Sequence, residues 1–306
     1  MPIYCIKFLH PGGEHQPDSR GSDHKSWNIG PHLRKFMLGT GQVIDSAGYQ
    51  KGTAPKRSQI TLWGEWEPPS TILQQFDRVS QMPQYLHEPF LEFPQHQDSI
   101  QNTDPFVFGE RFRYTVCRQY VNGYPTILRN LPEGSVILFG SCVGSQFALD
   151  TVFVVDAGAF IWSHESRPEQ VEGDIDSIYL DATINRLQAD KPYRLYSGVR
   201  YKDRKRFNGI YSFVPCMIAD GKSSRFSRPM IDLPDIGLRQ TQGYKYLSKT
   251  EEGSVAIWEE VVRQVLGQGC SLATSIEMPK RRGERAGNVV ALPGSCAPKK
   301  NSCSSC

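Results

Sequence analysis

Short runs of β-branched and aromatic residues are the feature that most constrains the fold of this chain. Six such runs, each bounded by Gly, Pro, Asn or Ser, lie at 2–9, 59–66, 135–141, 147–155, 193–201 and 209–218. Runs of this composition are typical of strands, and the residues that bound them are typical of turns. Helical periodicity is weaker and predicts helices at 254–266, 174–188 and 31–38. The pattern therefore predicts an α+β protein with a curved or barrel-like, mostly antiparallel sheet and a few flanking helices.

The helices predicted at 254–266 and 31–38 are supported by residues that are typical of helix ends. Ser254 is suited to cap the helix at 254–266, and Gly267 supplies a stop. Pro31 is suited to the first turn of a short helix at 31–38.

Length and composition indicate a soluble globular protein. The chain has 306 residues, a formal net charge of +3, and 39% hydrophobic residues, which is enough for one large domain. We expect this domain to cover 1–278, followed by a flexible basic tail with three cysteines at 279–306. No apolar run approaches the roughly 20 residues of a membrane helix, and the first residues do not resemble a signal peptide. The expectation is a cytoplasmic protein with no membrane association, no cofactor, no bound metal and no obligate protein partner.

The stretch "LWGEWEPPS" at 62–70 combines two tryptophans with two acids where a strand must end at a double proline. With a period of two, Trp63, Glu65 and Glu67 share one face, and Trp66 lies on the other. Acids and glycine are poor choices for routine strand positions. We interpret the stretch as a strand end that lines a pocket, with an edge strand carrying solvated acids as the alternative.

A glycine-rich polar stretch follows the first strand and holds four of the seven histidines, His10, His15, His24 and His32. Loops at strand ends are common places for binding sites. We predict that His10, His15, Trp27 and Asn28 contact a substrate. A metal site using His10, Glu14 and His15, or adding His24, is the alternative, although the spacing matches no zinc signature. A surface loop that is merely rich in histidine is a third interpretation.

Two further acidic positions stand out. Asn102 and Asp104 lie in "QNTDPFVFGERFRY" (101–114), where they either shape a turn or contribute to a site. Asp104 close to Glu65 or Glu67 would provide the acids that hydrolysis of a glycosidic bond requires. Asp150 interrupts an apolar strand, so it either points outward or is buried with a partner.

A basic segment is the main indication of a nucleic-acid ligand. "KPYRLYSGVRYKDRKRF" (191–207) contains seven basic residues and one acid, with aromatic residues between them. Basic residues pair with phosphates and rings stack on bases, whereas a hairpin with a solvated basic face is the equally weighted alternative. The predicted phosphate contacts are Arg200, Lys202, Arg204, Lys205, Arg206 and Arg225.

Several motifs together resemble a group of bacterial proteins from nucleotide-modification and phage-defence gene neighbourhoods. The motifs are "HPGGEH", "WNIGPHLRKF", "LWGEWEPPS", "QNTDPFVFGERFRY", "SVILFGS", "FALDTVFVV" and "RQTQGYKY", spread over roughly residues 1–250. The paired strands at 135–155 are also similar to the small barrels of PUA-like base-binding domains.

The resemblance implies an activity directed at modified nucleobases in DNA, and a DNA glycosylase that flips the base out would fit. Trp27, Trp63 or Trp66 would form the walls of its site, with Asn102 also contacting substrate, and Glu65, Glu67 or Asp104 would supply the acid. The chain lacks the helix-hairpin-helix pattern and the short motifs of common uracil-excising enzymes, so no specific glycosylase family is implied. The alternatives are a non-catalytic reader of modified bases or RNA, and a metal-dependent hydrolase or nuclease built on the N-terminal histidines.

Overall fold

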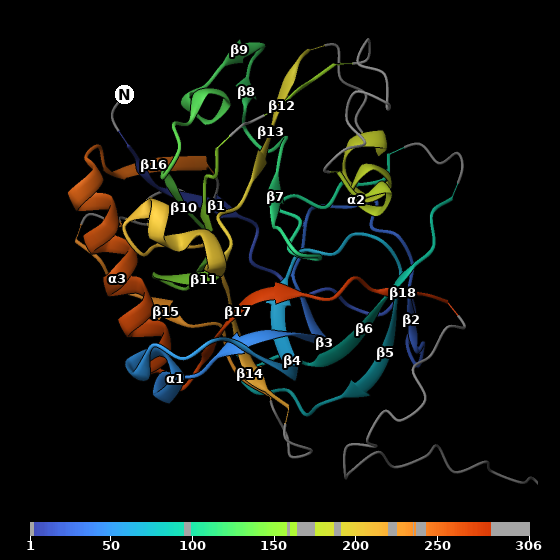
Figure 1. The fold of residues 1–306 in the computed structure, drawn as a ribbon. Helices are drawn as coiled ribbons and strands as arrows, with labels where there is room; N and C mark the ends of the chain where they lie inside the picture. Colours follow the sequence, from blue (N-terminus) through green and yellow to red (C-terminus); the bar gives the residue numbers. More distant parts are fainter. Residues whose placement is uncertain are drawn as a thin grey trace, which may run out of the picture.

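The structure is a computed structural model that describes residues 3–94, 99–157, 160–163, 175–186, 191–219, 225–234, 236 and 243–282. Strand (40%) outweighs helix (17%), most strand pairs are antiparallel, and four strands close into a barrel. The predicted α+β, barrel-like architecture is confirmed (Figure 1). Within the described residues, no helix is long and apolar enough to cross a membrane.

The barrel is part of the larger sheet. Its four strands are β3 (Lys35–Ile44), β4 (Lys56–Gly64), β14 (Val214–Ile218) and β17 (Ser271–Ile276), and pairing of β17 with both β3 and β14 closes it. The sheet continues from β3 through β6 (Tyr85–Leu91) and β5 (Ser70–Gln75) to β2 (His24–Lys25). The small circumference demands glycine on β3, because a Cβ at Gly41 would lie 2.3 Å from the Ser275 carbonyl oxygen.

A five-stranded sheet lies beside the barrel. Its order is β15 (Met230–Ile231), β11 (Gln146–Val154), β10 (Val136–Val143), β1 (Cys5–His10) and β16 (Gly243–Ser248). β1 and β10 are parallel, with Cys5 opposite Val136 and His10 opposite Ser141, and the other pairs are antiparallel. Because β1 and β10 are parallel, His10 and Ser141 lie side by side at the same edge of the sheet.

Smaller elements complete the fold. A three-stranded sheet contains β12 (Phe160–Trp162), β13 (Tyr193–Ser197) and β7 (Arg113–Tyr114), and β8 (Tyr120–Val121) pairs with β9 (Tyr124–Pro125). The helices are α1 (Ser46–Lys51), α2 (Ser177–Ala182) and α3 (Glu251–Gly267), with 3₁₀ turns η1 (Ile127–Asn130), η3 (Ile184–Arg186) and η4 (Tyr201–Phe207).

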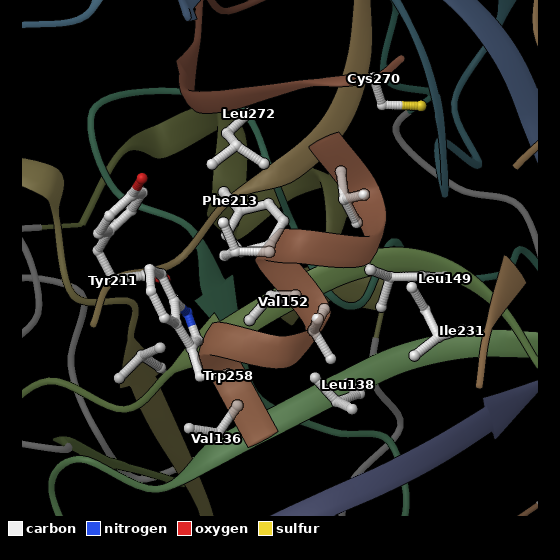
Figure 2. Packing of buried hydrophobic residues seen from close by; sticks show 14 of the residues in the cluster. Val136, Leu138, Leu149, Val152, Tyr211, Phe213, Ile231, Trp258, Cys270 and Leu272 are labelled. Carbon is white, nitrogen blue, oxygen red and sulfur yellow. The ribbon is translucent and has the colours of Figure 1, made fainter. Parts of the chain in front are cut away.

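Two apolar clusters stabilise this arrangement. In one, α3 packs against one face of the five-stranded sheet: Trp258 lies among Val136, Leu138 and Val152 (Figure 2). The other lies on the opposite face, where Phe8 and its neighbours meet barrel residues. Phe36 and Leu38 of β3 lie in one cluster and Met37 in the other, so burial on both faces explains why three consecutive residues of this strand are apolar.

Of the three predicted helices, one is confirmed, one is divided into two shorter elements, and one is wrong. The helix predicted at 254–266 is α3, but it begins at Glu251 because the Thr250 side chain, not Ser254, caps it. The segment predicted as one helix at 174–188 is α2 followed by η3 within its described part. The helix predicted at 31–38 is wrong: β3 begins at Lys35, since pairing with β4 and β17 overrides the local signal from Pro31.

All six predicted strand runs contain strands, with changed ends. The runs at 193–201 and 209–218 shorten to Tyr193–Ser197 and Val214–Ile218, and β4 begins three residues earlier than predicted and ends at Gly64. In the predicted tail, Lys280–Arg281 form β18 beside β6; residues 283–306 lie outside the described residues.

Candidate functional site

Histidines and carboxylates from four segments meet where β1 and β4 end. Lys35 pairs with Gly64, so the residues before β3 lie opposite those that follow β4. The loop after β1 runs beside the same segment, because Arg34 N–H donates to the Gly13 carbonyl (2.8 Å) and His15 N–H to the Arg34 carbonyl (2.9 Å). Backbone pairing alone therefore places His10, His15, His32, Glu65 and Glu67 around one point.

The side chains form a row in which histidines and glutamates alternate. His32 Nδ1 lies between the two acids, 3.1 Å from Glu65 Oε1 and 3.0 Å from Glu67 Oε1. His10 Nδ1 lies 3.5 Å from the other oxygen of Glu65, and His15 Nε2 lies 3.7 Å from the other oxygen of Glu67. The last two separations are too long for hydrogen bonds. We refer to His10, His15, His32, Glu65 and Glu67 as the His/Glu cluster.

The His/Glu cluster is almost completely enclosed. Both glutamates and His15 are buried, His10 is 7% exposed, and the His32 side chain is 23% exposed. His32 therefore marks the opening to solvent.

Several polar atoms of the cluster lack a hydrogen-bond partner among the described residues. They are His10 Nδ1, both ring nitrogens of His15, both oxygens of Glu65, and Glu67 Oε2. Buried polar groups are nearly always satisfied in folded proteins, so a concentration of such atoms at one place indicates a ligand site.

A buried ion-pair network supports the cluster from behind. Arg34 Nη1 lies 3.2 Å from Glu65 Oε1, while Arg34 Nε donates to Asp150 (2.7 Å). Arg228 approaches the second Asp150 oxygen at 3.3 Å and also donates to Ser141 Oγ and the Gly12 carbonyl. Asp150 thus ties β11 both to the loop after β1 and to the arginine that faces Glu65. The buried-partner interpretation of Asp150 is confirmed.

This environment moves the pKa values of the two acids in opposite directions. Burial raises the pKa of Glu65, but the charges of Arg34 and His10 and the close approach of His32 outweigh it and hold the value well below its usual range. Burial raises the pKa of Glu67, and His32 offsets this only in part. Burial lowers the pKa of His32, but the two glutamates overcome it and raise the value to about 10.

The inner side of the cluster is lined by basic groups whose pKa values are lowered by burial. Burial and the nearby Lys35 lower the pKa of His15 to about 2, and burial lowers that of Lys35 to about 7. Lys35 Nζ donates to the Pro68 carbonyl (2.8 Å), and His87 Nδ1 lies 3.0 Å from Ser70 Oγ.

The tryptophans predicted to bind substrate belong to the packed interior. Trp66 is fully buried, donates to the Pro69 carbonyl and packs edge-on against Phe108. Trp63 donates to the Phe226 carbonyl, and Trp27 donates to the Gln101 carbonyl. Large rings supply apolar contact area, and in these positions that area is used for packing. The predicted alternation along 62–67 is nevertheless present, since Trp66 lies in the apolar cluster that contains Leu62, and Trp63 lies in the other.

Two of the three polar residues predicted at the site, Asn28 and Asp104, have structural contacts. Asn28 accepts from Gly30 N–H and donates to the Pro31 carbonyl, so its amide shapes the loop before His32. Asp104 accepts three backbone N–H groups, from Thr115, Val116 and Cys117. Asn102 precedes Thr103, whose hydroxyl accepts from Glu67 N–H, and its buried amide nitrogen has no partner among the described residues.

Most of the predicted phosphate contacts lie away from the His/Glu cluster. Tyr201–Phe207 form η4, with Lys202, Lys205 and Arg206 exposed. Arg206 and Phe207 share a surface pocket with Ile3 and Gly134, which precede β1 and β10. His10 ends β1, so the basic turn and the cluster are separated by roughly 20 Å, the length of that strand.

The remaining arginines in this prediction have local partners. Arg200 pairs with Asp203 (2.6 Å), and Arg204 stacks on the Tyr201 ring. Arg225 donates to the Asp77 carbonyl and stacks on Phe76.

Sequence reasoning missed Arg34, Arg228 and the central place of His32. The wrong helix at 31–38 hid the first of these, because a helix would not align Arg34 and His32 with the end of β4. The metal set considered from the sequence is also different, since Glu14 accepts from Gln84 and Tyr85 N–H groups and His24 lies on β2.

Comparison with known proteins identified no relative of this chain. No protein-family profile matches the chain, and neither a curated protein nor a solved structure with significant similarity to it was found.

Proposed function

We propose that this protein is a hydrolase of nucleic acid that cleaves the N-glycosidic bond of a modified base, with Glu65 and Glu67 as its catalytic pair. The observation that carries the proposal is the convergence of two buried carboxylates on one partly exposed histidine. Structural acids are seldom buried in pairs, because each carboxylate loses its hydration and repels the other.

The spacing of the acids restricts the reaction they support. The donor atoms of His32, Glu65 and Glu67 all lie within 4.8 Å of one another. Carboxylates that act on glycosidic bonds from such short separations, about 5 Å, divide the work: one faces the sugar carbon, and the other protonates the leaving group and later activates water. A separation of about 6.5–9.5 Å is needed to hold a water between them. We therefore assign the two acids to the sugar carbon and to the leaving nitrogen of one bond.

The roles follow from the surroundings of each acid. Glu65, held ionised beside Arg34, faces the sugar carbon and stabilises the positive charge that develops there. Glu67 protonates the base nitrogen as the carbon–nitrogen bond breaks, and then takes a proton from the water whose oxygen bonds to the sugar carbon. His32 lies in contact with both acids. The products are the free base and an abasic sugar, and atoms and charge balance.

The narrow opening favours an unstacked nucleotide as substrate. Only His32 of the cluster is appreciably exposed, so a base within a duplex would have to leave the stack to reach the acids. The exposed basic residues of η4, roughly 20 Å away, would hold phosphates about six nucleotides along the same strand. This distance favours an extended nucleic acid over a free nucleotide.

The test uses purified protein with modified phage DNA and with unmodified DNA. Free base is measured by mass spectrometry and abasic sites by alkali cleavage. We expect both products from the modified DNA, and a loss of at least 100-fold in rate in Glu65→Gln and Glu67→Gln but not in Glu259→Gln, which changes an exposed acid on α3. DNA that is bound but intact would identify a reader of modified bases, and would refute the hydrolase.

A further inference from the structure

We infer that the His/Glu cluster is a binding site for one divalent transition-metal ion, held by His32, Glu65 and Glu67. This inference deepens the proposed function, since it concerns the same side chains, but metal binding can be tested without any substrate. Four observations support it: the distances between donor atoms, the buried atoms without partners, the charge of the surroundings, and the open side at His32.

The distances suit a shared ion. Donor atoms about 2.1 Å from a metal lie about 3.0–3.4 Å apart in octahedral or tetrahedral geometry. The nitrogen of His32 lies 3.1 Å and 3.0 Å from the nearest oxygens of Glu65 and Glu67. Backbone pairing of β3 with β4 fixes this arrangement, so the three donors are placed before any ion binds.

The glutamate oxygens without hydrogen-bond partners would be stabilised by a cation or by a hydrogen-bond donor. Neither oxygen of Glu65 accepts a well-directed hydrogen bond from a described residue, and the same is true of Glu67 Oε2. These side chains are at least 97% buried, and buried acceptors without partners are costly, most of all when they are charged. An ion between the two glutamates would satisfy Glu65 Oε1, while His10 and His15 face the two Oε2 atoms.

The outer histidines are placed to orient the ligands. His10 and His15 each face the oxygen that is farther from His32, on Glu65 and Glu67 respectively, at 3.5 Å and 3.7 Å. Groups in this position hold metal-binding carboxylates in a fixed orientation, and such contacts tighten when the ion draws the ligands together.

The local charge favours a cation despite the two arginines. Glu65, Glu67 and Asp150 carry three negative charges when ionised, and Arg34 and Arg228 carry two positive charges. These acids therefore exceed the arginines by one negative charge, and an ion would take the place of the proton that the two glutamates hold on His32. Asp150 accepts from Arg34 Nε and Arg228, so Arg34 is shared between Asp150 and Glu65 Oε1, which its Nη1 approaches at 3.2 Å.

The donor types indicate which ion. One imidazole and two carboxylates suit Zn²⁺, Mn²⁺ or Fe²⁺, whereas Mg²⁺ and Ca²⁺ prefer oxygen donors alone. Three protein ligands leave a position open, as in catalytic sites, and the exposed edge of His32 places that position at the opening. With an ion bound, Glu67 would serve as a ligand in place of its proton-transfer role, and the ion would supply the proposed hydrolysis with a water that ionises near neutral pH.

The experiment measures metal content without substrate. The protein is stripped with chelator, incubated separately with Zn²⁺, Mn²⁺ and Fe²⁺, freed of excess ion by gel filtration, and analysed by mass spectrometry of the elements. We expect about one ion per chain in the wild type and in His24→Ala, a matched control on β2. We expect less than about one tenth of that in His32→Ala and in Glu67→Gln.

A second measurement distinguishes the loss of metal binding from a failure of the variant to fold. Co²⁺ bound by the wild-type protein should give visible absorption bands that vanish on addition of Zn²⁺, and Zn²⁺ should raise the melting temperature of wild-type protein only. Equal metal content in wild type and both variants, or no retained ion in the wild type, would overturn the inference.

The two proposals fail in different ways. Metal that binds at the predicted residues without any release of base would support the site and refute the glycosylase. Base release by metal-free protein that retains no added ion would support the acid pair and refute the metal site.

Discussion

Changing Asp104 to asparagine separates a structural acid from a catalytic one. The Asp104 side chain accepts N–H groups from Thr115 (2.9 Å) at one oxygen and from Val116 and Cys117 (2.7 Å each) at the other. An asparagine amide has only one accepting oxygen, so it can keep the pair of donors but must turn its NH₂ group toward Thr115 N–H. We therefore expect Asp104→Asn to destabilise the fold.

The size of the loss follows from these bonds. One buried N–H left without an acceptor costs about 1–3 kcal/mol, and two bonds that lose the charge of their acceptor weaken by about 1 kcal/mol each. The sum is about 3–5 kcal/mol, which lowers the melting temperature by roughly 5–15 °C in a chain of this size. Burial, opposed by the three backbone N–H groups, raises the pKa of Asp104 to about 6, so the comparison is made at pH 7.5, where the wild-type acid is ionised.

Urea unfolding followed by tryptophan fluorescence measures the change in free energy, and calorimetry the melting temperature. Asp77→Asn, at an exposed acid, is the control and should change stability by less than about 0.5 kcal/mol. An Asp104→Asn protein that melts with the wild type but releases no base would refute this reasoning and restore Asp104 as a catalytic acid.

Three further variants test other parts of the structure. Lys35→Met should remove a pH dependence of stability. The pKa of Lys35 is about 7 in the folded protein and 10.5 in the unfolded chain, so unfolding takes up a proton between these two pH values. The free energy of unfolding of the wild type should therefore rise by roughly 2 kcal/mol from pH 7 to pH 9. Urea unfolding in chelator at both pH values checks it, and an equal rise in the variant would contradict a buried neutral lysine. Trp66→Leu should cost about 2–4 kcal/mol of stability by leaving a cavity, measured by calorimetry; unchanged stability with weakened DNA binding would instead favour a substrate wall. Gly12→Ala places a Cβ 2.9 Å from Ser141 Cβ, so the loop after β1 must shift at a cost of about 1–3 kcal/mol, and normal stability by urea unfolding would show that this loop moves freely.

The local pattern of the sequence was enough for the strands and for α3. Runs such as 135–141 and 147–155 are apolar because both faces of β10 and β11 are buried, and this burial leaves a signal that does not depend on distant residues. The period of two along 62–67 likewise placed Glu65 and Glu67 on one side of the chain and Trp66 on the other.

The composition of the site could be predicted only in part. Glu65 and Glu67 were predicted because acids are poor choices for a strand, and His10 and His15 because they lie in a polar loop after a strand; the structure brings all four together. Trp63 and Trp66 were predicted from the same strand as the acids, and Asp104 from a separate acidic stretch, but they serve packing and backbone hydrogen bonds.

Which of these residues meet depends on the long-range pairing of strands. Pairing of β3 with β4 places His32 opposite Glu65 and Glu67, and the parallel β1–β10 pair places Asp150's partners beside them. Such contacts join residues more than 30 positions apart, and side-chain chemistry along the chain carries no record of which strands will be neighbours. Local sequence therefore specifies the strands, the helix α3 and the kinds of side chain available for chemistry, whereas long-range pairing places a histidine between two buried glutamates.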